Sequence, residues 1–183
     1  MAIYVNNPLT GSDILNTQLF MKKIKLTKGY SCLVDDEDFK ILSKNRWYVM
    51  ESRGNAYASG CINKKRYVKM HRFLMKPKNS NVVDHINHNT LDNRRGNLRI
   101  CTRSQNSRNK TAWLKVKKKS KYKGVTFEKR CPLHPWRVRI KTNSGRIHIG
   151  YYATQIEAAK DYDRAAIQYH GEFAYTNLSK RSQ

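Results

Sequence analysis

The sequence predicts an α+β fold in which short antiparallel strands and a few helices form two small domains. Short runs that alternate apolar and polar residues recur along the chain, and turn residues separate them, which is typical of half-buried strands. Residues 154–170 instead show the spacing of an amphipathic helix. A chain of 183 residues has room for one ordinary domain or two small ones.

Changes of composition along the chain predict its organisation. Residues 1–20 carry no Lys or Arg, so they form either a flexible leader or a stretch ahead of a functional start at Met21. The segments expected after them are a small β-rich region that leads into a strand–loop–strand–helix unit (21–110, with the unit at 81–110), a basic linker (111–120), a three-stranded antiparallel sheet packed on one helix (121–178) and a tail (179–183).

The chain is strongly basic, with 37 Lys and Arg against 13 Asp and Glu and a net charge of +24. This charge favours a polyanion as partner, because each phosphate that a protein neutralises releases condensed counterions. A merely solvated cationic surface is the alternative. Membrane binding is not expected, since no apolar run approaches the ~18–20 residues of a spanning helix and no signal peptide opens the chain.

The four cysteines are widely spaced and include no Cys-x-x-Cys pair. Structural zinc sites normally draw on closely spaced ligand pairs, so no structural zinc is expected. With no secretory signal, reduced thiols and a cytoplasmic location are the expectation.

The first domain is expected to begin as a small meander followed by a short helix. Strand patterns occur at 22–26, 30–34, 46–49, 56–58 and 66–70, and the helical segment 71–75 ends before a proline. The four consecutive acids at 35–38 favour the start of a further short helix, where carboxylates suit the helix dipole. A paired-carboxylate site is the alternative for these acids.

The segment 82–109 is the centre of the functional prediction. A short apolar run leads into Asp84 and His85, a polar loop follows, and a second strand at 97–101 passes into a helix start at 102–109. This unit could bring Asp84, His85 and Asn106 together for metal-assisted hydrolysis of a phosphodiester bond. Two oxygen ligands and a neutral imidazole suit Mg²⁺ and the activation of water. Because adjacent strand residues point to opposite faces, the strand must end or bend at Asp84 and His85.

The segment resembles the ββα-metal (HNH) endonuclease motif, in the Asp-His…Asn…Asn form of phage homing endonucleases. By matched position, the resemblance implies that His85 is the general base and that Asp84 and Asn106 bind one Mg²⁺ or Mn²⁺ per active site. Asn97 matches the catalytic-motif residue that pins the loop between the strands. Many relatives carry His where this chain has Asn106.

Other basic residues near this segment are candidates for the same site. Residues 22–75 resemble the region that often precedes the motif, and His71 either contributes to the site or packs as a structural histidine. Four arginines in or after the loop are candidates for clamping phosphate: Arg94, Arg95, Arg99 and Arg103.

Residues 121–178 predict a sheet with one core face and one cationic face. Strand patterns at 122–127, 136–141 and 146–150 are joined by turns, and a capping box opens the helix at Thr154 and Glu157. The apolar residues Val138, Ile140, Ile147 and Ile149 alternate with the basic set Arg137, Arg139, Lys141, Arg146 and His148.

This second unit resembles the AP2 DNA-binding domain. The resemblance is carried by Tyr-Lys-Gly-Val, Ile-x-Ile-Gly-x-Tyr, Glu-Ala-Ala-x-x-Tyr-Asp-x-Ala-Ala and a closing Asn-Leu, and it covers nearly all of 121–178. It implies that the sheet lies in the major groove of double-stranded DNA. The implied contacts are Lys123, Thr126, Trp136, Arg139, Lys141, Arg146 and His148, and Arg137 joins them on the cationic face.

Together these resemblances predict a metal-dependent homing-type endonuclease that an AP2 sheet positions on DNA, with the basic linker following the backbone. The protein would act in the host cytosol if a phage encodes it. A non-catalytic, sequence-specific DNA-binding regulator is the competing interpretation, and a basic RNA-binding protein is a third. Whether the protein is a monomer or a homodimer is left open by the sequence.

Overall fold

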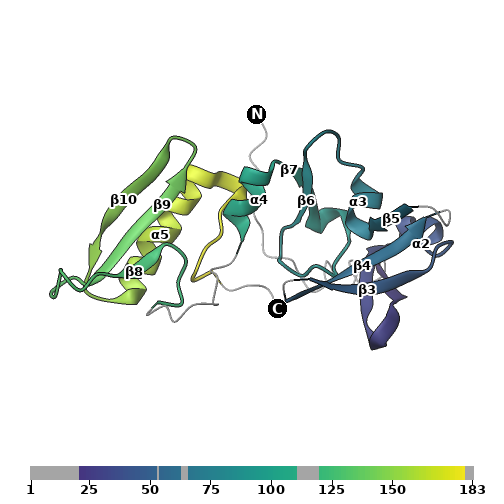
Figure 1. Ribbon diagram of the computed structural model, residues 1–183, viewed down its shortest axis with the longest axis horizontal. Coiled ribbons are helices and arrows are strands. Elements are labelled where there is room, and N and C mark those ends of the chain that lie inside the picture. Colours follow the sequence, from purple (N-terminus) through teal and green to yellow (C-terminus); the bar gives the residue numbers. More distant parts are fainter. Residues whose placement is uncertain (1–20, 53, 63–65, 111–119, 180–183) are drawn as a thin grey trace, which may run out of the picture. The chain divides into compact units, whose positions relative to one another are not determined.

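The computed structural model describes residues 21–52, 54–62, 66–110 and 120–179 (Figure 1). The chain divides into two compact units, Met1–Ile100 and Cys101–Gln183. Both units are mixed α+β with small sheets, which confirms the predicted class. The division falls before the last residue of the second strand of the central segment. The sequence predicted a boundary at the linker, most of which (111–119) lies outside the described residues.

The first unit contains three small sheets. Strands β1 and β2 form an antiparallel pair, β3, β4 and β5 form an antiparallel sheet in that order, and β6 pairs with β7. The strand bounds are β1 Met21–Lys25, β2 Ser31–Asp35, β3 Trp47–Ser52, β4 Asn55–Ile62, β5 Arg66–Lys69, β6 Val82–His85 and β7 Leu98–Cys101. The helices are α2 Asp36–Leu42 and α3 Met70–Met75, with 3-10 turns η1 Thr27–Gly29 and η2 Arg95–Asn97.

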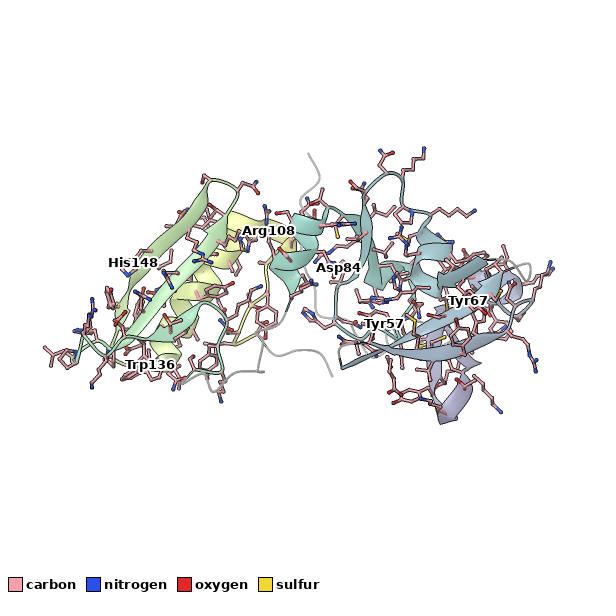
Figure 2. The ribbon with its side chains drawn as sticks, in the orientation of Figure 1. Tyr57, Tyr67, Asp84, Arg108, Trp136 and His148 are labelled. Atoms are coloured by element: carbon pink, nitrogen blue, oxygen red, sulfur yellow. The ribbon has the colours of Figure 1, made fainter. Side chains whose placement is uncertain are left out.

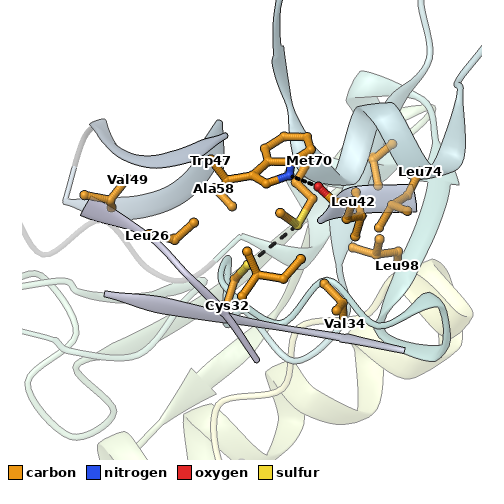
Figure 3. Packing of buried hydrophobic residues seen from close by; sticks show 12 residues of the cluster. Leu26, Cys32, Val34, Leu42, Trp47, Val49, Ala58, Met70, Leu74 and Leu98 are labelled. Carbon is orange, nitrogen blue, oxygen red and sulfur yellow. Dashed lines mark hydrogen bonds between the residues drawn. The ribbon is translucent and has the colours of Figure 1, made fainter. Parts of the chain in front are cut away.

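The core of the first unit lies between these sheets and the two helices (Figure 3). Val34, Leu42 and Met70 are fully buried within it. The indole of Trp47 donates a hydrogen bond of 2.8 Å to the carbonyl of Leu42, so a polar atom of this large residue is satisfied inside the core. The predicted meander and the predicted helix at 71–75 are both present, and the strands β3 and β4 extend three and four residues beyond their predicted ends.

The second unit packs one long helix on a three-stranded sheet. The strands β8 Val125–Phe127, β9 Trp136–Thr142 and β10 Gly145–Tyr152 lie in the order β10-β9-β8 and pair antiparallel. The helices are α4 Arg103–Asn109 and α5 Gln155–His170, followed by the 3-10 turn η3 Gly171–Phe173. The small side chains Ala158 and Ala166 are fully buried, so α5 lies close on the sheet, as the sequence predicted.

The first strand of the second unit is shorter than predicted because the chain turns at Gly124. This glycine has φ +77, a left-handed conformation that favours glycine, and its carbonyl accepts the backbone N–H of Arg139. A Cβ at this position would lie 2.1 Å from the Tyr162 ring. The close contact between the turn and the helix therefore requires glycine.

Within the described residues, no helix is both long enough and apolar enough to cross a membrane.

Candidate active site

Asp84 and His85 occupy the end of strand β6, and both are buried (8% and 5% exposed). The strand ends at His85, which meets the geometric condition set for a shared site. The chain then turns: the N–H of Ile86 donates to the carbonyl of Asn97 at 2.9 Å, and His88 adopts a positive φ of 66°. The two side chains thus lie at the junction between strand β6 and the loop that follows it.

The Asp84 carboxylate forms a nearly buried ion pair with Arg99 on the neighbouring strand β7. The guanidinium Nε and Nη2 of Arg99 donate to Oδ2 of Asp84 at 3.0 and 2.8 Å. The side chains are only 12% and 9% exposed. Because an unpaired charge is costly to bury, the Arg99 guanidinium offsets part of the cost of burying the Asp84 side chain.

His85 lies in an aromatic cluster with two residues from other elements. Its ring meets that of His71, from α3, edge to face at a centroid distance of 4.9 Å. The ring of Tyr57, from β4, lies 5.9 Å from His71 and 6.4 Å from His85 (Figure 2 labels Tyr57 and Asp84). The cluster fixes the imidazole of His85 between a helix and a sheet.

Burial keeps both imidazoles neutral at ordinary pH. It lowers the pKa of His71 to about 3, and the nearby charges of His85, Lys69 and Arg72 act in the same direction. Burial also lowers the pKa of His85, and this outweighs the opposite effects of a hydrogen bond with Asn93 and of the nearby carboxylates. A neutral imidazole is the form that can accept a proton from water.

Asn97 ties together the loop that follows His85. Its side-chain oxygen accepts the N–H of Asn87 at 2.9 Å, and its amide nitrogen donates to the carbonyl of Asp92 at 2.8 Å. Asp92 in turn binds the guanidinium of Arg94 through both carboxylate oxygens, at 2.8 and 2.7 Å. The loop is therefore held from within, and the part that Asn97 plays in catalysis stays a prediction.

The same loop is also held from outside by the amino-terminal elements. The N–H of Leu33 in β2 donates to the carbonyl of Leu91 at 2.9 Å, and the carbonyl of Leu33 accepts the N–H of Asn93 at 2.8 Å. These bonds place the loop beside β2 as a short parallel bridge. Thr90 adds a hydrogen bond from its hydroxyl to the carbonyl of Ala56 in β4.

The acidic cluster at 35–38 begins a short helix, as predicted, and two of its acids also bind the loop. Helix α2 does begin here with three acids in its first turn, but Asp35 makes no side-chain cap. Its carboxylate accepts the N–H of Arg95 at 2.7 Å, and Asp38 binds the guanidinium of Arg95 through both oxygens at 2.8 Å. Asp35 and Asp38 thus anchor the loop.

Three of the four predicted phosphate-clamping arginines therefore have carboxylate partners inside the protein. Arg94, Arg95 and Arg99 bind Asp92, Asp38 and Asp84, respectively. Each of these cations balances a buried or nearly buried carboxylate, and a role for them in clamping phosphate stays a prediction. Arg103, at the start of α4, is exposed.

Asn106 lies in helix α4, which opens with a capping box. The Thr102 hydroxyl accepts the N–H of Gln105, and the Gln105 side chain accepts the N–H of Thr102 at 2.8 Å. Since α4 belongs to the second unit, a shared ion between Asp84 and Asn106 stays a prediction. Among the described residues, no group of three or more His, Cys, Asp or Glu could hold a metal ion.

In the second unit, the face of the sheet opposite α5 carries the predicted basic residues. Direct cross-strand pairing puts His148 opposite Arg139 and Arg146 opposite Lys141, so all four share one face. Lys141, Arg146 and His148 are exposed, as is Thr126 on β8. We call Arg137, Arg139, Lys141, Arg146 and His148 the cationic face. Arg137 is partly neutralised there by Glu128 at 3.1 Å.

Two of the predicted DNA contacts lie elsewhere. Trp136 is on the core side of β9 with Val138, where it packs edge to face on Phe127 at 5.2 Å, as period-two alternation requires. The ammonium of Lys123 is turned toward the end of α4, where it donates to the carbonyls of Arg108 and, at 2.8 Å, of Lys110. Both side chains are thus used inside the unit rather than on the cationic face.

Comparison with known proteins assigns the central segment. A family model described as HNH endonuclease matches residues 77–108. The chain is also similar to an uncharacterized HNH endonuclease of Acanthamoeba polyphaga mimivirus, with 28% identity over 165 residues, which cover 90% of this chain and 83% of the relative. Residues 77–108 are thus similar to HNH endonucleases. Both similarities indicate a nuclease, which is a hydrolase of phosphodiester bonds.

A second similarity is confined to part of the chain. This part is similar to APETALA2-like protein 2 of Oryza sativa, in both the indica and the japonica subspecies. The identity is 40% over 65 residues, which are 34% of this chain and 14% of each rice protein. No solved structure matches the chain significantly.

Around the HNH motif, sequence reasoning missed Tyr57 and Lys69 and left His71 undecided. These residues lie on β4, β5 and α3, far along the chain from His85, and the motif spacing carries no information about them. In the second unit it missed Tyr151, which pairs with Arg137 and lies 4.8 Å from the His148 ring. The signal for Tyr151 was hidden by a register shift between His148 and Gly150.

Proposed function

We propose that the protein is a metal-dependent DNA endonuclease of the homing type, in which His85 activates water and an AP2-like sheet positions the chain on double-stranded DNA. The observation that carries this proposal is the state of His85. It is a buried imidazole with a lowered pKa, fixed at the end of β6 within the segment that the HNH family model matches.

His85 acts as the general base in this proposal. Burial holds the imidazole neutral, so it can accept the proton of a water molecule that attacks the phosphorus. The edge-to-face contact with His71 restricts rotation of the ring, and a fixed ring loses less entropy when the water binds. Asn97 keeps the adjoining loop in shape.

Asp84 and the amide oxygen of Asn106 are the proposed ligands for one Mg²⁺ or Mn²⁺. The donor set fits such a cation, because a carboxylate and an amide oxygen are hard ligands. When bound, the cation would stabilise negative charge on the phosphate and on the leaving oxygen. Asp84 also fixes the position of Arg99 beside the site.

The cationic face supplies the proposed DNA contacts of the second unit. Its exposed members Lys141, Arg146 and His148 lie side by side on two strands, and Arg139 stands between them. Contacts to guanine from Arg or Lys would give sequence preference, and contacts to phosphate would set the register. Tyr151 extends this surface at its outer strand.

One active site per chain implies one cleaved strand per binding event. A monomer of this kind would nick duplex DNA, and a double-strand break would require a dimer or two successive events. The product distribution on a supercoiled plasmid therefore tests the stoichiometry together with the activity.

The deciding experiment is plasmid cleavage by the full chain with Mg²⁺. We expect nicked circles from the wild type, and we expect EDTA and the His85→Ala substitution to abolish nicking while DNA binding is retained. His134→Ala is the matched control, because His134 is an exposed histidine in a turn of the second unit. Binding to DNA with no metal-dependent cleavage would instead favour a non-catalytic regulator.

A further inference from the structure

Lys69 brings a cation into the cluster around His85. It is the last residue of β5 and pairs across the sheet with Ser59 of β4. Tyr57 lies two residues before Ser59 on the same face, so Lys69 and Tyr57 are diagonal neighbours. The ammonium of Lys69 stands 3.7 Å from the centre of the Tyr57 ring, a close cation–π contact.

The aromatic rings connect this cation to the general base. Tyr57 contacts the rings of both His71 and His85 at centroid distances of 5.9 and 6.4 Å. The charge of Lys69 is near enough to help lower the pKa of each imidazole. The cation and the base are thus part of one cluster, assembled from β4, β5, α3 and β6.

Lys69 differs in its partners from the ion-paired cations of the first unit, and its ammonium lies over an aromatic ring. In the described part of this unit, the carboxylate ion pairs use Lys22, Lys28, Arg94, Arg95 and Arg99, and Lys69 takes part in none of them. Lys69 is nevertheless half-buried, and burial, assisted by the charge of Arg72, lowers its pKa. A half-buried cation held only by an aromatic face is incompletely compensated.

We infer that Lys69 is a substrate-contacting residue of the nuclease site, whose ammonium binds a phosphate oxygen of the DNA strand presented to His85. This inference rests on the proposed endonuclease function. Tyr57 acts as its platform: the ring holds the ammonium beside the imidazoles without neutralising it, as a carboxylate would. A phosphate would supply the negative charge that the surroundings of Lys69 lack.

This assignment also provides a phosphate-binding cation in place of the loop arginines. Arg94, Arg95 and Arg99 were the sequence candidates for contacting phosphate, and each is bound to a carboxylate of the protein. Charge stabilisation near the attacked phosphorus is usually among the largest contributions to phosphodiester hydrolysis. Lys69 supplies this charge from a strand outside the HNH motif.

The test uses the full chain carrying Lys69→Met, with Lys69→Arg as the charge-preserving variant. Lys40→Met is the matched control, because Lys40 is an exposed lysine on α2 of the same unit. Two quantities are measured: kcat/KM for nicking with Mg²⁺, and the salt dependence of DNA binding in EDTA. Circular dichroism and thermal melting establish that each variant is folded.

We expect Lys69→Met to lower kcat/KM on the order of a hundredfold, which is typical for loss of one charge-stabilising group. The slope of log K against log salt should fall by about one, as for the loss of one phosphate contact. Lys69→Arg should retain most of both quantities, and Lys40→Met should match the wild type.

The inference on Lys69 is overturned if the Met variant cleaves like the wild type or binds with an unchanged salt slope. Equal losses in the folded Met and Arg variants would also contradict it, since they would point to packing rather than charge. If the wild type binds DNA but does not cleave it, the result contradicts the endonuclease proposal and not the inference on Lys69. In that case the salt slope alone still decides whether Lys69 contacts phosphate.

Discussion

Gly124 marks the closest approach between the turn before β8 and helix α5. A Cβ there would lie 2.1 and 2.2 Å from the Tyr162 ring and 2.8 Å from the carbonyl oxygen of Arg139, at a φ of +77. Both the space and the backbone conformation exclude a side chain, so two separate penalties add at this residue.

We predict that Gly124→Ala destabilises the protein by more than about 2 kcal/mol, because overpacking against a buried ring is added to left-handed backbone strain. Gly145→Ala is the control, since Gly145 has a φ of +131 but nothing within 4 Å of a Cβ. It should cost about 1 kcal/mol, from backbone strain alone. Urea unfolding followed by circular dichroism measures both, and equal losses would contradict the steric argument.

Asp92 is the most completely buried carboxylate of the loop between β6 and β7, at 1% exposure. Burial by itself would raise its pKa, but hydrogen bonds and charge from Arg94, with a hydrogen bond from Asn87, lower the pKa below its ordinary value of 3.8. A carboxylate with a depressed pKa in the folded state contributes stability above that ordinary value, and this stability is lost as the pH falls further.

We predict that the wild type loses free energy of unfolding below about pH 4 more steeply than Asp92→Asn does. The variant is less stable at pH 6, because Arg94 loses its ionic partner, but it lacks the proton uptake that this buried carboxylate causes. Denaturant titrations at pH 6, 4 and 3 give the two slopes. Parallel pH profiles would show that Asp92 does not carry the effect.

At the scale of residues, the sequence predicted the motif but not its surroundings. Asp84, His85 and Asn97 were identifiable because they are close in the chain and have a characteristic spacing. Tyr57 and Lys69 were not, because only the pairing of β4 with β5 and the packing of α3 bring them to His85. The carboxylate partners of Arg94, Arg95 and Arg99 were equally hidden, since they depend on contacts between separate segments.

At the scale of elements, the strand β10 shows where alternation stops being informative. Up to His148 its residues alternate as the sequence suggests, but Gly150 then pairs with Val138 and Tyr151 pairs with Arg137. One extra residue at this irregularity reverses the two faces of the remaining strand. Tyr151 therefore joins the cationic face, and Tyr152 packs on the core.

Helix α4 shows a different limit of sequence reasoning. Its start was predictable from local residues, because the capping box of Thr102 and Gln105 is a short-range pattern. Its end is held by Lys123, which follows the linker in the sequence and donates to the carbonyl of Lys110. Burial lowers the pKa of Lys123 to about 8. No local signal shows that this lysine would turn inward, so it was predicted as a DNA contact.

At the scale of the whole molecule, α4 belongs to the same compact unit as the sheet and α5. Lys123 bonds to the carbonyls of Arg108 and Lys110, and Arg108 bonds to the side chain of Asn143. The carboxyl end of α4 is therefore attached to two positions of the second unit.

We predict that a fragment starting at Cys101 is more stable than one starting at Lys121. Removing α4 takes away the carbonyl acceptors of the half-buried Lys123 ammonium and the bond from Arg108 to Asn143, which costs about 1–3 kcal/mol. For a unit of this size that loss corresponds to a decrease in Tm of roughly 4 °C or more. Calorimetry of the two fragments measures the difference, and equal Tm values would favour a boundary at the linker.

The attachment of the β6–β7 loop to β2 determines how much of the chain a shortened nuclease must keep. The loop is hydrogen-bonded to the first hairpin through Leu33, and Arg95 of the loop binds Asp35 and Asp38 at the start of α2. The hairpin and α2 both precede the residues that the HNH family model covers. A minimal version trimmed to the matched segment would keep every motif residue yet lose the scaffold that shapes it. The amino-terminal hairpin therefore supports the loop from outside the motif. A shortened nuclease made from this chain has to begin no later than β1.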